Sequence, residues 1–225
     1  MGSLSRMSSP DRTHFSSHWS PLPDWSPGRS LLACYVTFDD EPGVHAVVDA
    51  YQEPLADVAT LDLVQRRWLH TTVQGVWFAD ALPPGAQASL ADAVGEALVG
   101  IPAPEVELTP PVIGAEGVYL PVRPAEGLTR VRDGVRAAIR AGLGLAEPYV
   151  LPGQAGVFDP HVTLAYANDA FPVAEVRRRL DTVGHLSTPL TVRGVTLLVV
   201  DRTWQWTDAV HVGFPAVPRT MAAIG

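Results

Sequence analysis

The order of strand-like and helix-like patterns along this chain occurs twice, and this repetition limits the folds that the chain can adopt. Hydrophobic periodicity and turn residues predict the elements of both halves. In chain order they are strand 31–38, helix 43–58, strand 68–78, helix 86–99, extended segment 104–111, strand 117–123, helix 125–141, strand 161–167, helix 173–181 and strands 189–200 and 204–214. We therefore expect an α+β fold with two similar β/α lobes, related by pseudo-two-fold symmetry around a central cleft.

The same patterns predict the boundaries of the folded part. Residues 1–30 carry Ser and Pro clusters without periodicity, so we expect a flexible N-terminal tail. Residues 31–225 are expected to form a single bilobal domain, with a first half of about 31–115 and a second half of about 116–214. Three prolines in the segment 104–111 favour an edge position for it.

The charged residues exclude several kinds of function. All 16 basic residues are arginine, so Schiff-base chemistry on lysine and the phosphate-binding loop ending in Gly-Lys-Ser/Thr are excluded. The 24 acidic residues give a net charge of −8, which repels nucleic acid and disfavours broad binding to duplexes.

The apolar residues and the single cysteine bear on the location of the protein. Cys34 has no partner for an internal disulfide. No apolar run reaches the roughly 20 residues of a membrane span. We expect a soluble, cytoplasmic monomer with no membrane partner and no cofactor.

Two copies of a His-x-Thr-apolar motif stand at equivalent places in the two halves. The sequence His-Thr-Thr-Val begins at His70, and His-Val-Thr-Leu begins at His161. Both lie in predicted strands, where side chains two residues apart point to the same face. His70 therefore shares a face with Thr72, and His161 shares a face with Thr163. If the lobes face each other, two imidazoles and two hydroxyls meet in one cleft.

This set of groups suits in-line displacement at phosphorus. One imidazole can take a proton from the attacking oxygen while the other protonates the leaving oxygen. The hydroxyls can hydrogen-bond the non-bridging oxygens, where negative charge sits in the transition state. The reaction needs no metal, and His-x-Thr is not the spacing of zinc ligands.

Over residues 31–214, the paired motifs in two β/α lobes resemble the two-histidine (2H) phosphoesterase superfamily. Within it, the chain looks like the bacterial 2′-5′ RNA ligase and cyclic nucleotide phosphodiesterase branch. The resemblance implies metal-independent hydrolysis of 2′,3′-cyclic phosphodiesters, or the reversible joining of RNA ends. It also implies that His70 and His161 are the acid and base, and that Thr72 and Thr163 bind the phosphate.

One position departs from the pattern of the resemblance. RNA-processing members often carry an arginine just after the second motif, where this chain has Ala165 and Tyr166. With the acidic net charge, this leads us to expect a small cyclic nucleotide, with an RNA terminus as the other possible partner.

Three more residues are predicted to contact substrate. By strand alternation, the first of them, Gln74, shares the face of His70. The same alternation places Tyr166, which is not one of these three, on the opposite, core face of its strand. The long segment 143–160 carries Tyr149 and Phe158 and leads into the second motif, so it is a possible lid that stacks on a base.

The sequence leaves two other functions open. RNA end-joining uses the same groups, with a ribose hydroxyl in place of water, and needs a basic channel beside the site. A non-catalytic nucleotide-binding module could use the same fold, although binding alone does not require two imidazoles. Which histidine is the base stays open, because hydrolysis and its reverse exchange the two roles.

Overall fold

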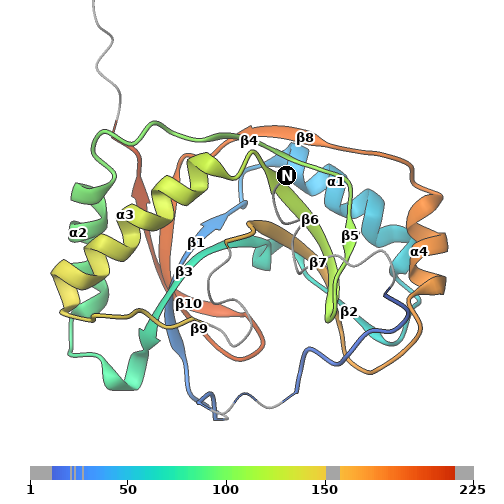
Figure 1. Cartoon of the computed structure of the whole chain (residues 1–225), viewed down its shortest axis with the longest axis horizontal. Helices are drawn as coiled ribbons and strands as arrows, with labels where there is room; N and C mark the ends of the chain where they lie inside the picture. The colour runs from blue at the N-terminus through green and yellow to red at the C-terminus, as the bar shows by residue number, and fades with distance from the viewer. Residues whose placement is uncertain (1–11, 21, 23, 27, 151–157, 216–225) are drawn as a thin grey trace, which may run out of the picture.

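The computed structural model describes residues 12–20, 22, 24–26, 28–150 and 158–215, and shows a mixed α/β fold built on two curved antiparallel sheets (Figure 1). The four-stranded sheet has the order β10-β9-β1-β3, with β1 Leu31–Thr37, β3 His70–Phe78, β9 Gly194–Val200 and β10 Trp206–Gly213. The second sheet has six strands in the order β2-β7-β6-β4-β8, with β5 paired to β6. These strands are β2 Leu61–Leu63, β4 Glu105–Leu108, β5 Val112–Ile113, β6 Gly117–Arg123, β7 His161–Ala167 and β8 Thr188–Thr191.

The helices divide between the two sheets. The α-helices of the described residues are α1 Pro42–Gln52, α2 Ala86–Ala97, α3 Glu126–Leu143 and α4 Ala174–Asp181. Single 3₁₀ turns are η1 Glu53–Leu55, η2 Arg66–Trp68 and η3 Ala79–Ala81. In Figure 1, α2 and α3 lie beside the four-stranded sheet, whereas α1 and α4 lie at the other end of the molecule. The mixture of helices and strands that the sequence predicts is confirmed, and the structure shows that the paired strands are antiparallel.

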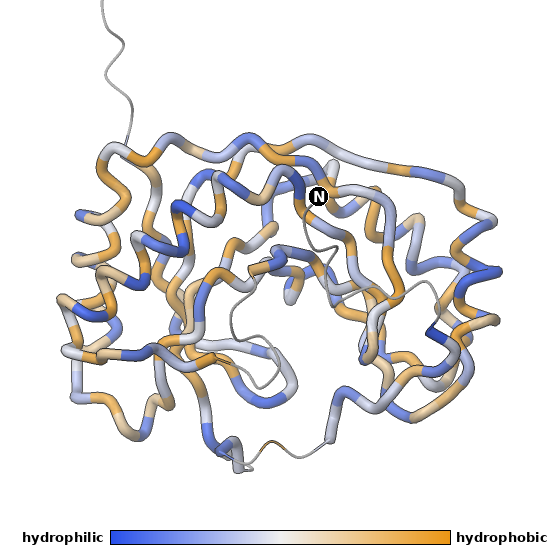
Figure 2. The backbone as a smooth tube through the Cα atoms, viewed as in Figure 1, coloured by the Kyte–Doolittle hydropathy of each residue, from blue (hydrophilic) through white to orange (hydrophobic). Residues whose placement is uncertain are grey.

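Helix α3 shows how the sequence sets this packing. Its buried residues recur every three or four positions, as an amphipathic helix requires. They are Leu128, Val131, Val135, Ala138 and Ile139. Hydrophilic and hydrophobic stretches accordingly alternate along this helix in Figure 2. Gly144 ends α3 in the left-handed conformation with φ +65°, so its N–H reaches the carbonyl of Arg140.

The faces of the four-stranded sheet follow from its register. On β10, the side chain of Val212 points to α2. A Cβ atom added to Gly95 of α2 would lie 3.7 Å from the Val212 side chain. Its neighbour His211 therefore points to the opposite face. We call that opposite face the open face of the sheet, because helices α2 and α3 cover the other side.

The N-terminal segment does not behave as the predicted tail. Phe15 is 1% exposed and Trp25 is also buried in the hydrophobic core. The N–H of Phe15 donates to the carbonyl of Phe171, and that of His18 donates to Ala167. In Figure 1 this segment runs along the lower edge of the molecule, between the two sheets. The prediction of a flexible tail is therefore wrong for the described residues of 12–30, because burial of their aromatic side chains stabilises the packed arrangement.

Two strand predictions also need correction. Segment 104–111 is not an edge, because β4 pairs with both β6 and β8. Its prolines lie outside β4, at its two ends, and so remove no hydrogen bond from the ladder. The predicted strand 189–200 is two strands, β8 and β9, which belong to different sheets. Residues 192–193 form the link between them.

The packing of the N-terminal segment predicts a measurable loss of stability. Phe15→Ala removes a ring that stacks on Phe171 at 4.7 Å between centroids. We expect the free energy of unfolding to fall by about 3 kcal/mol, as for other buried aromatic residues. Urea denaturation monitored by tryptophan fluorescence measures this change.

The matched control is Val99→Ala, because Val99 is 68% exposed. It should change the free energy of unfolding by less than about 0.5 kcal/mol. A Phe15→Ala protein as stable as this control would show that the N-terminal segment contributes nothing to the fold.

Candidate functional site

The two histidines of the motifs occupy equivalent positions. His70 is the first residue of β3 and His161 is the first residue of β7. These two strands belong to different sheets and contact each other where the sheets meet. The Nδ1 atom of His70 lies 2.8 Å from the carbonyl oxygen of Trp68, and that of His161 lies 2.8 Å from the carbonyl oxygen of Asp159. A carbonyl only accepts, so both Nδ1 atoms carry the hydrogen. In both rings, Nε2 is left as the atom available for proton transfer.

A tyrosine stands beside each imidazole. Tyr35 on β1 pairs with Thr72, and its ring stacks on His70 at 4.2 Å and 5°. Tyr119 on β6 pairs with Thr163, and its ring meets His161 edge-on at 4.9 Å and 72°. In both sheets the tyrosine is thus the cross-strand neighbour of the threonine and the ring neighbour of the histidine.

These tyrosines were missed in the sequence. Each lies in the first strand of its half, in the runs Ala-Cys-Tyr-Val and Gly-Val-Tyr-Leu. The signal was an aromatic residue at a similar place in both halves, but the strand register that pairs it with the threonine is a tertiary property. The ring of Trp206, the first residue of β10, also lies 5.7 Å from that of His70.

Each motif strand has a bulge directly after its threonine. Along β3, Thr72 pairs with Tyr35 and Gln74 pairs with Cys34, so Val73 has no opposite residue. Along β7 the register likewise passes from Thr163 to Ala165, which skips Leu164. In both motifs the skipped residue is the apolar one that completes His-x-Thr-apolar. A bulge of this kind shifts the alternation of the strand by one residue.

The first bulge corrects the placement of Gln74. Its partner Cys34 lies on the opposite face of β1 from Tyr35, so Gln74 does not share the face of His70. Its amide nitrogen donates to the carbonyls of Gly75 and Tyr149, and its oxygen accepts from the Nε of Arg132 on α3. Gln74 therefore ties β3 to neighbouring segments, and a role in substrate binding stays a prediction.

The second bulge corrects the placement of Tyr166. It pairs with Gly117, which lies on the same face of β6 as Tyr119, so Tyr166 shares the face of His161 and Thr163. Burial raises the pKa of Tyr166 to about 12, and the nearby Thr163 hydroxyl opposes this shift. The prediction that Tyr166 points into the core behind the motif is wrong.

The N-terminal segment forms one wall beside Tyr166. The ring of His18 stacks on Tyr166 at 4.2 Å. The indole N–H of Trp204 donates to the Nε2 of His18 at 2.7 Å, and the Nδ1 of His18 lies 3.0 Å from a carboxylate oxygen of Glu116. Because the indole is only a donor, Nε2 is unprotonated and Nδ1 carries the hydrogen. Segment 12–20 thus links the two sheets next to the second motif.

Burial keeps the two catalytic candidates neutral. Burial lowers the pKa of His70 from 6.5 to about 4, although the hydrogen bond to Trp68 opposes this and the nearby His161 adds to it. Burial also lowers the pKa of His161, against the effects of its hydrogen bond to Asp159 and of the Asp159 charge. A charge on His161 lowers the pKa of His70, so the two rings interact electrostatically across the two sheets.

The two aromatic residues predicted in a lid have packing contacts. Tyr149 is buried, with its ring against Trp25, Trp77 and Phe78. The guanidinium of Arg132 lies 4.9 Å from the centre of the Phe158 ring. Substrate contacts of Tyr149 and Phe158 stay predictions, and the middle of the predicted lid, 151–157, lies outside the described residues.

Two features are absent from the described residues. Among them, no group of three or more His, Cys, Asp or Glu side chains could hold a metal ion. No helix in the described part of the chain has the length and hydropathy required to cross a membrane.

Comparison with known proteins gives a family match. The family model of the 2′-5′ RNA ligase superfamily matches residues 38–204, which is well over half of the chain and includes both motifs. No curated protein matches the chain.

Solved structures share the fold at low sequence identity. The protein TT0787 of Thermus thermophilus has a TM-score of 0.55 at 20% identity, over 81% of this chain and 97% of that one. The MHV ns2 PDE domain has a TM-score of 0.52 at 12% identity, over 76% and 99%. The conserved protein of unknown function ATU0111 from Agrobacterium tumefaciens has a TM-score of 0.52 at 16% identity, over 89% and 90%. At these identities the likeness concerns the fold alone.

Because the pKa of His70 is low, the folded protein should lose stability as the pH falls. An unfolded histidine binds a proton near pH 6.5, whereas folded His70 stays neutral down to about pH 4. The unfolded chain therefore binds more protons in this window, so the stabilisation is complete above pH 6.5 and is lost toward pH 4. We expect His70 to account for about 3 kcal/mol of this loss.

His70→Gln provides the comparison, since glutamine does not titrate. Urea denaturation at about pH 7 and about pH 4.5 should show a steeper loss of unfolding free energy in the wild type than in the variant. Equal losses in the two proteins would contradict the buried, neutral state of His70.

Proposed function

The chain belongs to the 2′-5′ RNA ligase superfamily, and from this premise we propose that it is a metal-independent hydrolase of phosphoric ester bonds, specifically of 2′,3′-cyclic phosphodiesters of nucleotides or RNA ends. One observation carries the proposal. The two His-x-Thr strands hold their imidazoles in the same tautomer, by the same backbone contact, and a charge on His161 lowers the pKa of His70.

We further propose that the molecule has two lobes with pseudo-two-fold symmetry, and that the motifs face a common cleft. The correspondence of strands β1 and β3 with β6 and β7 supports this arrangement. In both pairs a tyrosine opposes the motif threonine, and in both the bulge falls on the residue after that threonine. A two-fold axis between β3 and β7 would place the Nε2 atoms on opposite sides of one phosphate.

In the proposed reaction, the Nε2 of one histidine takes a proton from water as its oxygen attacks phosphorus. The bond from phosphorus to one ribose oxygen breaks, and the protonated Nε2 of the other histidine gives that oxygen its proton. The product is a nucleoside 2′- or 3′-phosphate. General acid and general base catalysis each contribute roughly 10²–10⁴ in rate. Thr72 and Thr163 donate to the non-bridging oxygens, where charge is held in the transition state.

Binding of the substrate would produce the protonation states of the two imidazoles that the reaction requires. Both imidazoles are neutral at pH 7 in the free protein, because burial lowers both pKa values. A phosphodiester anion between them favours the charged form of a ring and so raises its pKa. Binding therefore prepares one charged acid and one neutral base.

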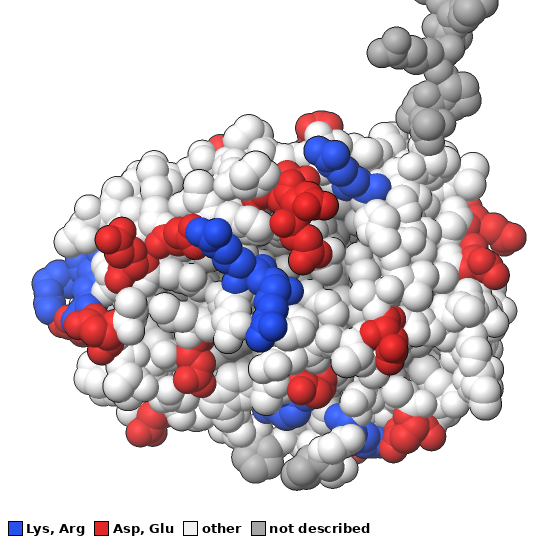
Figure 3. Space-filling view, turned by 180° about the vertical axis from the view of Figure 1, so that it is seen from behind, with Lys and Arg blue, Asp and Glu red and all other residues white. Residues whose placement is uncertain are grey.

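The surface charge favours a small substrate over RNA end-joining. The net charge is −8, and on the face shown in Figure 3 arginine side chains lie among acidic ones. End-joining uses the same imidazoles with a ribose hydroxyl as the nucleophile, and it stays an alternative outcome of the assay below. Cytoplasmic location and a monomeric state remain part of the proposal.

The first test is turnover of 2′,3′-cyclic mononucleotides. We expect the wild type to release the nucleoside monophosphate, with activity that survives a chelator such as EDTA. His70→Ala and His161→Ala should each lower kcat by about a thousandfold or more, because each removes one proton-transfer group. Separation of substrate and product by ion-exchange chromatography measures the rates.

His185→Ala is the matched control, since His185 is exposed and lies outside both motifs. It should retain the wild-type rate. Loss of activity with EDTA would contradict the metal-independent reaction. Binding of cyclic nucleotides without any turnover would instead support a nucleotide-binding module.

The pH dependence gives a second test of the acid and base. The profile of kcat/KM reports the free protein, so its optimum should lie below pH 6.5, the usual pKa from which both rings are shifted down. The profile of kcat reports the complex, in which the bound anion raises the pKa values, so its optimum should lie at higher pH. Coinciding optima would argue against this coupling between the substrate charge and the two rings.

A further inference from the structure

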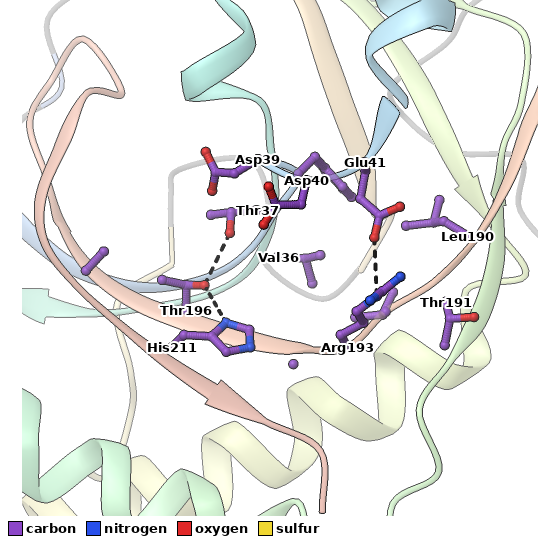
Figure 4. A pocket seen from close by; sticks show the side chains of 14 residues that line it. Val36, Thr37, Asp39, Asp40, Glu41, Leu190, Thr191, Arg193, Thr196 and His211 are labelled. Atoms are coloured by element: carbon purple, nitrogen blue, oxygen red, sulfur yellow. Dashed lines mark hydrogen bonds and ion pairs between the residues drawn. The ribbon is translucent and has the colours of Figure 1, made fainter. Parts of the chain in front are cut away.

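A cavity opens at Thr37, the cross-strand partner of His70, and has no role in the proton transfers described above. It has a volume of about 390 Å³, within the range of small-molecule sites. It lies where the turn from β1 to α1 meets the link between β8 and β9 and the end of β10 (Figure 4). We call it the β1–β9 pocket.

The β1–β9 pocket starts directly beside the first motif. Thr37 in its wall is the cross-strand partner of His70, and such partners have Cα atoms about 4.5–5.5 Å apart. Thr196 pairs with Tyr35, and His211 pairs with Thr196. Opposite residues of antiparallel strands share a face, so these side chains all lie on the open face of the sheet, together with His70. A molecule held at His70 could therefore extend into the pocket.

The wall of the pocket carries a line of hydrogen-bonding groups. The hydroxyl oxygens of Thr37 and Thr196 lie 3.3 Å apart, and that of Thr196 lies 3.3 Å from the Nδ1 of His211 (Figure 4). Thr196 is only 5% exposed, so its hydroxyl is held in place by its surroundings. Hydroxyl and imidazole groups both donate and accept, which suits them to bind alcohols.

The charges around the pocket disfavour a second anion. Asp39, Asp40 and Glu41 line it together with one cation, Arg193, whose Nε lies 3.5 Å from a carboxylate oxygen of Glu41. Asp39 and Asp40 are exposed and are left in excess. Their oxygens only accept hydrogen bonds, so they repel phosphate and bind hydroxyl or amino hydrogens. Carboxylates bind ribose hydroxyls in this way in dinucleotide sites.

We propose that the β1–β9 pocket binds the uncharged, hydroxyl-bearing sugar end of the substrate. The proposal rests on the function proposed above and names its substrate class. The substrate has a single phosphodiester held at the two motifs and a nucleoside whose 5′ end is a free hydroxyl. A second phosphate at that end would meet Asp39 and Asp40.

Kinetics with two matched substrates test this specificity. One is a 2′,3′-cyclic mononucleotide with a 5′-hydroxyl, and the other is the same nucleotide with a 5′-phosphate. We expect the wild type to prefer the 5′-hydroxyl substrate at least about tenfold in kcat/KM. The double variant Asp39→Asn, Asp40→Asn should lose most of this preference, because the repulsion disappears while its exposed side chains keep their shape.

A second variant removes one hydrogen-bonding group from the pocket wall, the hydroxyl of Thr196. Thr196→Val should raise KM for the 5′-hydroxyl substrate about tenfold and change kcat less than about twofold, since proton transfer at His70 does not use this hydroxyl. Asp181→Asn, an exposed carboxylate at the end of α4, is the control and should change neither constant. Equal kcat/KM for the two substrates in the wild type would overturn the proposal, as would unchanged constants in both variants.

Direct binding separates this proposal from the proposed function. Uridine or adenosine, which carry no phosphate, should shift the NMR signals of the His211 ring in the inactive His70→Ala protein, and Thr196→Val should abolish the shift. If no cyclic phosphodiester is turned over but the shift is seen, the catalytic proposal fails and the pocket stands. If turnover is normal and neither nucleoside moves the His211 signals, the pocket proposal fails alone.

Discussion

Two hydrogen bonds from imidazole to backbone determine what this structure can do. Each motif histidine donates Nδ1–H to a carbonyl two residues before it, so neither ring can turn and Nε2 is the atom left to exchange protons. The bonds depend on the chain turning just before β3 and just before β7. They also depend on burial, which removes water as a competing partner and lowers the pKa of both rings.

The two bulges decide which side chains accompany the imidazoles. They bring Tyr166 to the face of His161 and take Gln74 away from the face of His70. Strict alternation predicts the opposite for both residues, and it fails because one inserted residue reverses the order of faces beyond it. The first two positions after each histidine precede the bulge, and for this reason the pairing of His with Thr survives.

The N-terminal segment shows a different limit of sequence reasoning. Its Ser and Pro content and its lack of periodicity are typical of a tail, yet Phe15 and Trp25 are in the core and His18 lies against Tyr166. Single aromatic residues can anchor an irregular segment when a groove already exists to receive them. Here the contacts reach Tyr166 and Ala167 on β7 and Trp204 next to β10, and such contacts leave no periodic trace in the segment itself.

The sequence by itself determined the main elements, the mixture of helices and strands, and the two His-x-Thr motifs, because these follow from local spacing along one strand or helix. The family match agrees with that assignment. Only the tertiary structure decided the partners of each strand, the position of β4 inside its sheet, the tyrosine beside each motif and the pocket next to His70. These features join residues far apart in the chain, and their contacts are set by register and by the meeting of two sheets, which no local pattern encodes.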